Sequence, residues 1–213
     1  MTSILQVQRI NASDLSIDAF VENYLIPGVP VLISASTRDW AACREWVNSD
    51  GSPNVDALAS KYGASRVRAT RMDFEAAYGE DDIKLMTLSE YVRWWKAREH
   101  HDGENPAWYL KDWHFASEYP SAQMYACPRY FEEDWLNGWL DDCAAKARAE
   151  SSGDSESSAE SQDYRFVYLG PRGTHTPMHT DVLKSHSWST NVAGTKRWTL
   201  LPPEAASALL DAQ

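Results

Sequence analysis

Cysteine is scarce in this chain, and its spacing argues against two common kinds of small domain. The 213 residues include three cysteines, Cys43, Cys127 and Cys143, which lie far apart and form no C-x-x-C pair. An odd number of widely spaced cysteines is untypical both of a disulfide framework and of a zinc ribbon. We therefore expect the protein to work in a reducing compartment.

Long apolar runs and basic stripes are lacking as well. No stretch of about 20 apolar residues is present, so we expect no membrane span. The N-terminal region lacks the basic-then-apolar order of a signal peptide, which favours the cytoplasm, with the nucleus as a second compartment. The net charge is −11, and the sequence has no basic stripe, so we expect no direct nucleic-acid binding.

Aromatic residues, in contrast, are plentiful. Apolar residues make up 43% of the chain, which also holds ten tryptophans and ten tyrosines. This composition and length predict a single globular domain, residues 1–213, with a large aromatic core. We divide it into a helical and strand-containing support (1–142), an acidic insertion (about 143–163) and the first strands of a β-barrel (164–203).

The support contains several segments with helical or strand periodicity. Apolar spacing and capping signals predict helices over 14–25, 38–47, from Ser52-Pro53 onward and from Thr87 onward, and strands over 30–33, 66–72 and 107–111. Thr87 and Glu90 match a capping box. A short helix or turn is expected over 134–140.

The insertion and the segment after it differ sharply in composition. Residues 143–163 carry alanine, serine and acids but no large apolar side chain before the end, so we expect the later part to be disordered. From residue 164 onward, strands are predicted over 165–169, 176–181, 187–192 and 196–201, with turns at Gly170–Gly173 and Ala193-Gly194.

The triplet His179-Thr180-Asp181 lies in the second of these strands. Side chains two apart in a strand share a face, so the imidazole and the carboxylate can reach one point. They match two ligands of a 2-His-1-carboxylate site for Fe(II). An ordinary turn pair is the plain alternative, because H-x-D triplets are common by chance.

The residues around this triplet carry a more specific pattern. The pattern comprises Gly170-Pro171-x-Gly173-Thr174-x-Thr176-Pro177-x-His179-x-Asp181, Trp188-Ser189-x-Asn191-Val192-x-Gly194-x-Lys196-Arg197-Trp198 and Pro202-Pro203. It resembles the JmjC family of Fe(II)- and 2-oxoglutarate-dependent oxygenases. The segments 41–47, 109–115 and 133–137 resemble a subfamily of lysyl hydroxylases that act on a translation termination factor.

The resemblance implies a fold, a cofactor set and a role for seven residues. It implies a double-stranded β-helix (the jelly-roll or cupin barrel) with helices packed on it, and decarboxylation of 2-oxoglutarate coupled to hydroxylation of a protein substrate. His179 and Asp181 would bind Fe(II). Thr176 and Lys196 would hold the far carboxylate of 2-oxoglutarate, with weaker candidates at Ser189, Asn191 and Tyr168. Lys196 as a surface lysine and Thr176 as a plain strand residue remain the alternatives.

The chain departs from the family in one respect. The family's third metal ligand is a histidine well downstream of H-x-D, and no histidine follows His186. We therefore expect a barrel that is incomplete at its C-terminus and lacks the distal ligand. A fragment of an active hydroxylase, a non-catalytic binding module and a histone lysine demethylase remain open as functions. We expect His175 and His186 to be surface residues and His114 to be structural.

Overall fold

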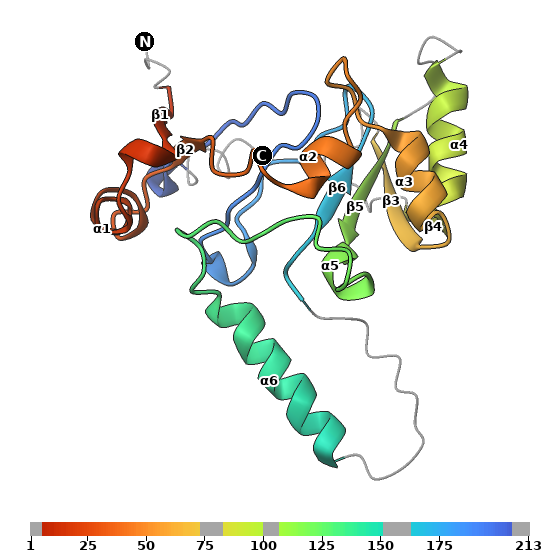
Figure 1. The fold of residues 1–213 in the computed structure, drawn as a ribbon. Coiled ribbons are helices and arrows are strands. Elements are labelled where there is room, and N and C mark those ends of the chain that lie inside the picture. The colour runs from red at the N-terminus through yellow and green to blue at the C-terminus, as the bar shows by residue number, and fades with distance from the viewer. Residues whose placement is uncertain (1–5, 73–82, 100–106, 151–162, 206–213) are drawn as a thin grey trace.

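The computed structural model describes residues 6–72, 83–99, 107–150 and 163–205. Its centre is a four-stranded antiparallel sheet with the order β4-β3-β5-β6 (Figure 1). The strands are β3 (Arg66–Met72), β4 (Ile83–Thr87), β5 (Ala107–Trp113) and β6 (Val167–Leu169). The strands predicted over 66–72 and 107–111 are confirmed, and the second continues to Trp113.

Two helices cover one face of this sheet, α3 (Val55–Tyr62) and α4 (Leu88–Glu99) (Figure 1). The predicted capping box starts α4: the Thr87 amide donates to Glu90 Oε2 at 2.7 Å, and the Glu90 amide donates to Thr87 Oγ1 at 3.2 Å. Tyr91 of α4 is fully buried. Its hydroxyl lies 2.8 Å from the carbonyl oxygens of both Trp108 and Leu169, which share its one proton, so it joins α4 to β5 and β6.

Residues 8–34 form a smaller unit around a separate aromatic core, which Tyr130 and Phe131 also join. β1 (Gln8–Asn11) pairs in parallel with β2 (Val31–Ser34), and between them lie a 3-10 turn η1 (Ala12–Asp14), α1 (Ile17–Phe20) and a π-helical turn η2 (Val21–Leu25). The helix predicted over 14–25 is therefore confirmed in part. It begins after Ser16, whose hydroxyl accepts the Ala19 amide, because that side chain supplies the cap.

Two predicted helix boundaries are wrong for local reasons. The third helix begins after Asn54, whose side chain accepts the Ala57 amide, and not at Ser52. Pro53 instead forms a β-bridge with Val47. The helix predicted over 38–47 is shorter, α2 (Ala41–Glu45), because Trp40 has an extended backbone with ψ 137° and Val47 forms the β-bridge with Pro53.

Helix α6 (Trp135–Glu150) is longer than the short element predicted over 134–140, and it projects away from the sheet (Figure 1). Residues 143–150 therefore continue a helix, because alanine, lysine and arginine favour one; residues 151–162 lie outside the described residues. The chain returns at Asp163, and the Tyr164 amide donates to Asn137 Oδ1 at 2.7 Å. This bond joins the start of α6 to the approach to β6.

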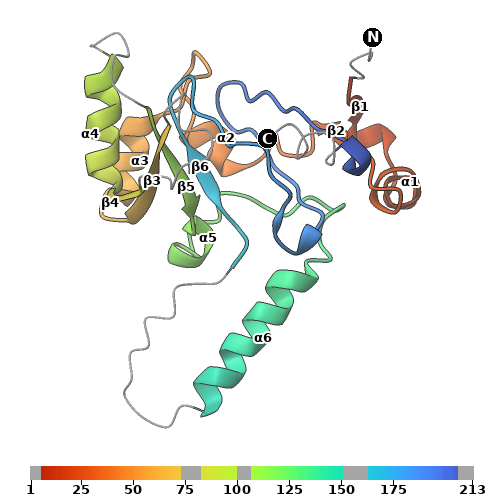
Figure 2. The same cartoon turned by 180° about the vertical axis from the view of Figure 1, so that it is seen from behind.

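The predicted strands after β6 are not formed. No β-ladder hydrogen bonds are formed by segments 176–181, 187–192 and 196–201. Regular structure in this part of the chain is confined to two 3-10 turns outside those segments, η3 (Val182–Lys184) and η4 (Pro203–Ala205). A strand needs a neighbouring strand for its amides and carbonyls, and within the described ranges none pairs with these segments. They lie between the sheet and the N-terminal unit (Figure 2).

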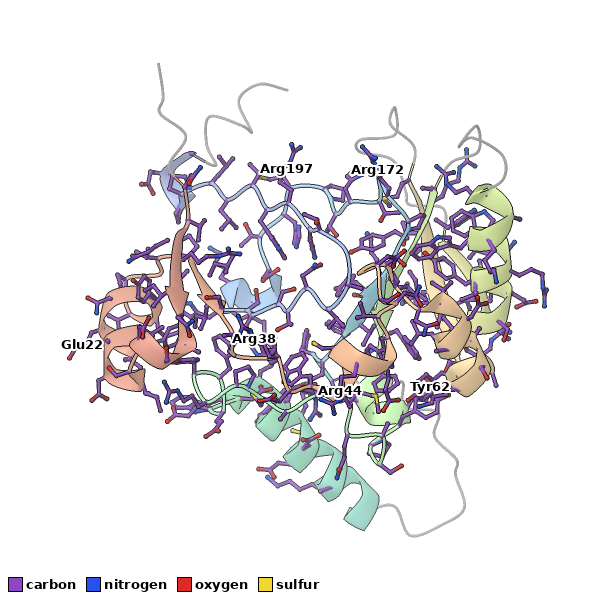
Figure 3. All side chains as sticks on the ribbon, turned by 45° about the horizontal axis from the view of Figure 1, so that its top comes forward. Glu22, Arg38, Arg44, Tyr62, Arg172 and Arg197 are labelled. Carbon is purple, nitrogen blue, oxygen red and sulfur yellow. The ribbon has the colours of Figure 1, made fainter. Side chains whose placement is uncertain are left out.

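Ring contacts and one backbone hydrogen bond hold these segments after β6 in place. Trp188 stacks on Phe131 with centroids 5.1 Å apart and rings 6° from parallel. The Gly194 amide donates to the carbonyl of Gly51 at 3.1 Å. Arg172 and Arg197 lie along the outer edge of this part of the chain and point away from the molecule (Figure 3). Across the described ranges, no helix combines the length and the apolar character needed to cross a bilayer.

Candidate metal and cosubstrate site

His179 and Asp181 face each other, as their spacing predicts, although they lie in a loop and not in a strand. His179 Nε2 is 3.3 Å from Asp181 Oδ1. Two donors about 2.0–2.2 Å from one metal ion and at right angles to each other would be about 3 Å apart. Both side chains are partly open to solvent, with 52% and 40% exposed. The pair therefore offers adjacent nitrogen and oxygen donors to a cation.

Each of the two side chains is oriented by a further hydrogen bond. His179 Nδ1 is 2.8 Å from the carbonyl oxygen of Pro177. Since a carbonyl only accepts, Nδ1 carries a proton in this bond, which leaves Nε2 as the ring nitrogen that would bind a metal. On the far side, Ser187 Oγ donates to Asp181 Oδ2. Outer hydrogen bonds of this kind set the tautomer and direction of metal ligands.

The donor set fits part of an iron site. A nitrogen and a carboxylate oxygen are two donors of the facial triad typical of non-haem Fe(II). Among the described residues, no group of three or more histidine, cysteine, aspartate or glutamate side chains converges. The structure thus provides a two-donor half-site.

Thr176 and Tyr168, both predicted to contact the cosubstrate, meet at Tyr109 of β5. The Thr176 hydroxyl forms a hydrogen bond with Tyr109. Burial raises the pKa of Tyr109, and this hydrogen bond lowers it by a smaller amount. The Tyr109 and Tyr168 rings lie 5.9 Å apart. Gly170 permits this arrangement, because a Cβ there would lie 2.7 Å from the Tyr109 ring.

Tyr168 also links this cluster to the metal pair. Its hydroxyl donates to Asp112 Oδ1 at 2.7 Å. Burial, followed by this bond and the charges of Asp112 and Asp181, raises the pKa of Tyr168 far above its usual value. The phenol therefore keeps its proton at physiological pH and gives it to Asp112, while its oxygen can still accept a hydrogen bond.

Lys196 completes the cluster from the loop. Its ammonium lies 4.2 Å from the centre of the Trp198 ring and 5.6 Å from that of Tyr168. Burial lowers the pKa of Lys196. Aromatic faces hold an ammonium without neutralising it, so the cation stays available to a carboxylate. The structure thus brings Lys196, Tyr168 and Thr176 together.

Ser189 and Asn191 are not joined to this cluster by any described contact. The Asn191 amide donates to the carbonyl of Gly194 at 2.8 Å and closes the turn there. Ser189 is exposed. Their predicted role toward 2-oxoglutarate stays a prediction, as do those of the other site residues.

Three further histidines lie as expected from the sequence, while His100 and His101 lie outside the described residues. His175 and His186 are exposed. His114 has a structural role: its Nδ1 bonds the buried Asp163, which also receives Arg165 Nε at 3.1 Å. The His114 ring meets Phe166 edge-on.

Sequence reasoning missed three residues of the site. Tyr109 and Ser187 support Thr176 and Asp181, and Trp198 faces Lys196. Tyr109 carried no signal beyond its place in a predicted strand, because its partner is 67 positions away in the printed sequence. Ser187 lies six positions from Asp181, and only the turn at η3 brings it back.

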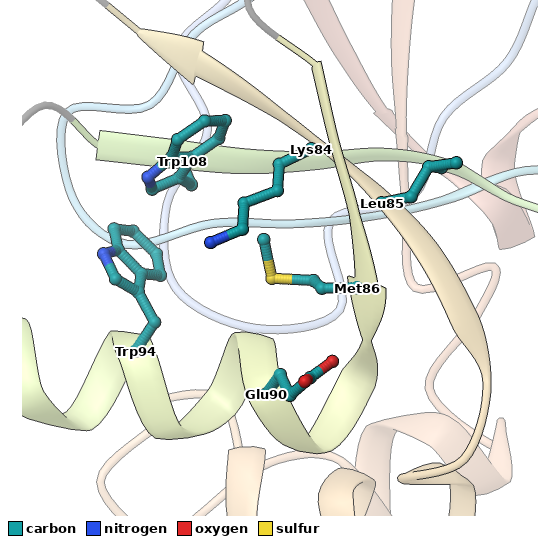
Figure 4. Close-up of a pocket in the computed structure, with 6 residues that line it drawn as sticks. All are labelled: Lys84, Leu85, Met86, Glu90, Trp94 and Trp108. Atoms are coloured by element: carbon teal, nitrogen blue, oxygen red, sulfur yellow. The ribbon is translucent and has the colours of Figure 1, made fainter.

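A separate cavity of about 270 Å³ lies between β4 and α4 (Figure 4). It is lined by Lys84, Leu85, Met86, Glu90, Trp94 and Trp108. It shares no residue with the metal pair or with the cluster around Lys196.

Comparisons with known proteins identify the family. Residues 17–213 match the model of the Cupin-like domain. The chain is 40% identical over 206 residues to "Arginine-specific demethylase JMJ20" of Arabidopsis thaliana, covering 97% of this chain and 44% of that protein. It is 36% identical over 195 residues to human "2-oxoglutarate and iron-dependent oxygenase JMJD4", covering 90% and 43%.

A third, more distant relative is "Bifunctional arginine demethylase and lysyl-hydroxylase psr-1" of Caenorhabditis elegans, 26% identical over 213 residues, covering 96% of this chain and 43% of that protein. The chain spans less than half the length of these relatives. The matches confirm the predicted resemblance and fold class.

Proposed function

Because the chain belongs to the cupin-like JmjC family, we propose that it is part of an Fe(II)- and 2-oxoglutarate-dependent oxygenase that acts on a protein. The observation that carries this proposal is the His179–Asp181 pair, with Nε2 and Oδ1 3.3 Å apart and an outer hydrogen bond on each side. The names of the relatives support the two cofactors, since JMJD4 is named for both.

Each residue of the site would have a defined task. His179 and Asp181 would bind Fe(II), while Pro177 and Ser187 hold the donors in direction. Lys196 would pair with the far carboxylate of 2-oxoglutarate, as a cation on a carboxylate, beside the Thr176 and Tyr168 hydroxyls. Ser189 and Asn191 are weaker candidates for the same pocket. With iron and 2-oxoglutarate bound, such a site supports oxidative decarboxylation coupled to C–H hydroxylation.

We propose lysyl hydroxylation of a translation termination factor as the specific reaction, in the cytoplasm with the nucleus as a second compartment. The resemblance of segments 41–47, 109–115 and 133–137 to the hydroxylase subfamily supports this choice. Arginine demethylation is the second candidate, since the JMJ20 match is 40% identical and that protein is named for it.

Metal binding by the 213-residue chain tests the half-site directly. We expect isothermal titration with Co(II), an oxygen-stable substitute for Fe(II), to show one weak site that His179→Ala and Asp181→Asn abolish. His186→Ala, which changes an exposed loop histidine, is the matched control and should leave the site intact. Equal binding by the wild type and His179→Ala would refute the assignment.

The reaction is tested on the protein isolated from its own cells, so that every residue of the native polypeptide is present. Incubation with Fe(II), 2-oxoglutarate and a lysine peptide of the termination factor should add one oxygen to the peptide by mass spectrometry. Loss of a methyl group from a methylarginine peptide, with release of formaldehyde, would select the second candidate instead.

A further inference from the structure

Helix α6 carries an exposed aromatic stripe that the proposed chemistry does not use. Trp135 and Trp139 are 79% and 62% exposed. With Gly138 and Asp142 they follow the i, i+3, i+4, i+7 spacing that places side chains on one helix face. We call these four residues the α6 stripe. A cluster of exposed tryptophans on a soluble domain marks an interaction surface more often than a scattered apolar residue does.

The shape of the stripe favours an inserted side chain over a flat contact. A Cβ added at Gly138 would meet no atom of a distant residue within 4 Å, so no other part of the described chain covers this position of the helix. Within the described residues, neither Trp135 nor Trp139 is in a ring contact. Both indoles therefore expose most of their surface to a group from outside.

The charge around the stripe is mainly negative, although the exposed Lys146 comes one helical turn after Asp142. Asp142 belongs to the stripe, and Glu132 and Glu133 come just before the helix, all three exposed. None of these three is in an ion pair within the described ranges, whereas Asp141 faces Arg165 at 3.6 Å. Indole faces bind lysine and arginine side chains, and nearby carboxylates complement their charge.

The root of the helix is connected to the metal pair. Phe131, four residues before Trp135, stacks on Trp188. Trp188 follows Ser187, whose hydroxyl bonds Asp181. A polypeptide bound along the stripe would thus be held by the same support that positions the metal ligands.

We propose that the α6 stripe docks a basic segment of the protein substrate, with a lysine or arginine side chain between Trp135 and Trp139. This deepens the proposed function and rests on it, because it assigns the segment to the substrate. A second copy of this chain is a poorer occupant, since two acidic stripes repel each other.

The test is a titration of the 213-residue chain, without metal, into a fluorescently labelled synthetic peptide that carries two lysines and two arginines. A counterpart peptide has glutamine at all four positions. We expect the basic peptide to bind more tightly. Trp139→Ala should weaken its binding roughly two- to fivefold, and Trp135→Ala with Trp139→Ala roughly tenfold. Asp142→Asn should weaken it roughly twofold at low salt and have little effect at high salt.

Matched controls separate the stripe from general effects. Ile26→Ala removes an apolar side chain that is 75% exposed, and Glu22→Gln removes an exposed charge on η2 at the other end of the molecule (Figure 3). Both should leave the affinity unchanged. His179→Ala should also leave it unchanged, so a failure of the metal assignment does not affect this result.

Three outcomes would overturn the proposal. The first is equal affinity for the basic peptide and its glutamine counterpart. The second is unchanged affinity of the double tryptophan variant, with circular dichroism showing that it is folded. The third is a wild-type dimer in sedimentation that the double variant dissociates, because the stripe would then be a contact between copies.

Discussion

Replacing Tyr91 by phenylalanine tests how much the hydrogen bonds between α4 and the strands β5 and β6 stabilise the protein. The Tyr91 hydroxyl lies 2.8 Å from the carbonyl oxygens of both Trp108 and Leu169, and the Leu110 amide points to it at 3.4 Å. Phenylalanine keeps the ring and its packing. It removes the donor from two carbonyls in a part of the core where water does not replace it.

The expected cost follows from that burial. A lost hydrogen bond that leaves buried partners without a donor destabilises a protein by about 1–3 kcal/mol. For a chain of this length, about 2 kcal/mol lowers the thermal midpoint by about 4–8 °C. Urea denaturation should show a lower midpoint at an unchanged slope, since the same surface is exposed on unfolding.

Tyr24→Phe is the matched control for this change. The Tyr24 ring is also buried, but its hydroxyl donates at 2.8 Å to Gln8 Oε1, which lies on an exposed residue and can bond water instead. We expect a cost of about 1 kcal/mol or less. Equal costs for the two variants, or a Tyr91→Phe cost below about 0.5 kcal/mol, would refute the reasoning.

Three further predictions concern the site and the cysteines. Ser187→Ala should weaken Co(II) binding about tenfold in calorimetry, because Asp181 loses its outer hydrogen bond, while Thr180→Ala should not. Because burial lowers the pKa of Lys196, this lysine loses its charge at a lower pH than an ordinary lysine does. When the affinity for 2-oxoglutarate is measured between about pH 7 and 10, the affinity of the wild type should therefore fall at a lower pH than that of Lys196→Arg. Equal pH profiles for the two proteins would contradict this. Mass spectrometry after brief iodoacetamide treatment should find Cys143 labelled before Cys43, since Cys143 is exposed and burial raises the pKa of Cys43; the reverse order would show that α6 is covered in solution.

Sequence alone predicted the parts of the fold that local signals determine. Thr87 and Glu90 lie within one helical turn and satisfy each other, so the start of α4 could be read directly. The predicted strand over 66–72 was equally recognisable from its composition. At Ser52, two local signals competed: Asn54 caps the helix, and Pro53 bridges to Val47.

Sequence could not predict the parts that depend on distant partners. Segments 176–181, 187–192 and 196–201 have the composition of strands, but a strand exists only when another supplies its hydrogen bonds. The candidate site shows the same division. His179 and Asp181 face each other as expected, but in a loop and not along the strand from which the expectation was derived. The contacts of Tyr109 with Thr176 and of Lys196 with Trp198 needed the three-dimensional structure.

The hydrogen bond from the Tyr164 amide to Asn137 fixes the chain just before β6, whatever lies between those two residues in the sequence. It closes an excursion of 27 positions at its base. Because the two ends of the excursion stay together, a change in the length of the serine-rich sequence should have little effect on β6, which carries Tyr168. For an experimenter, the same place is a natural position for grafting a reporter or an affinity tag.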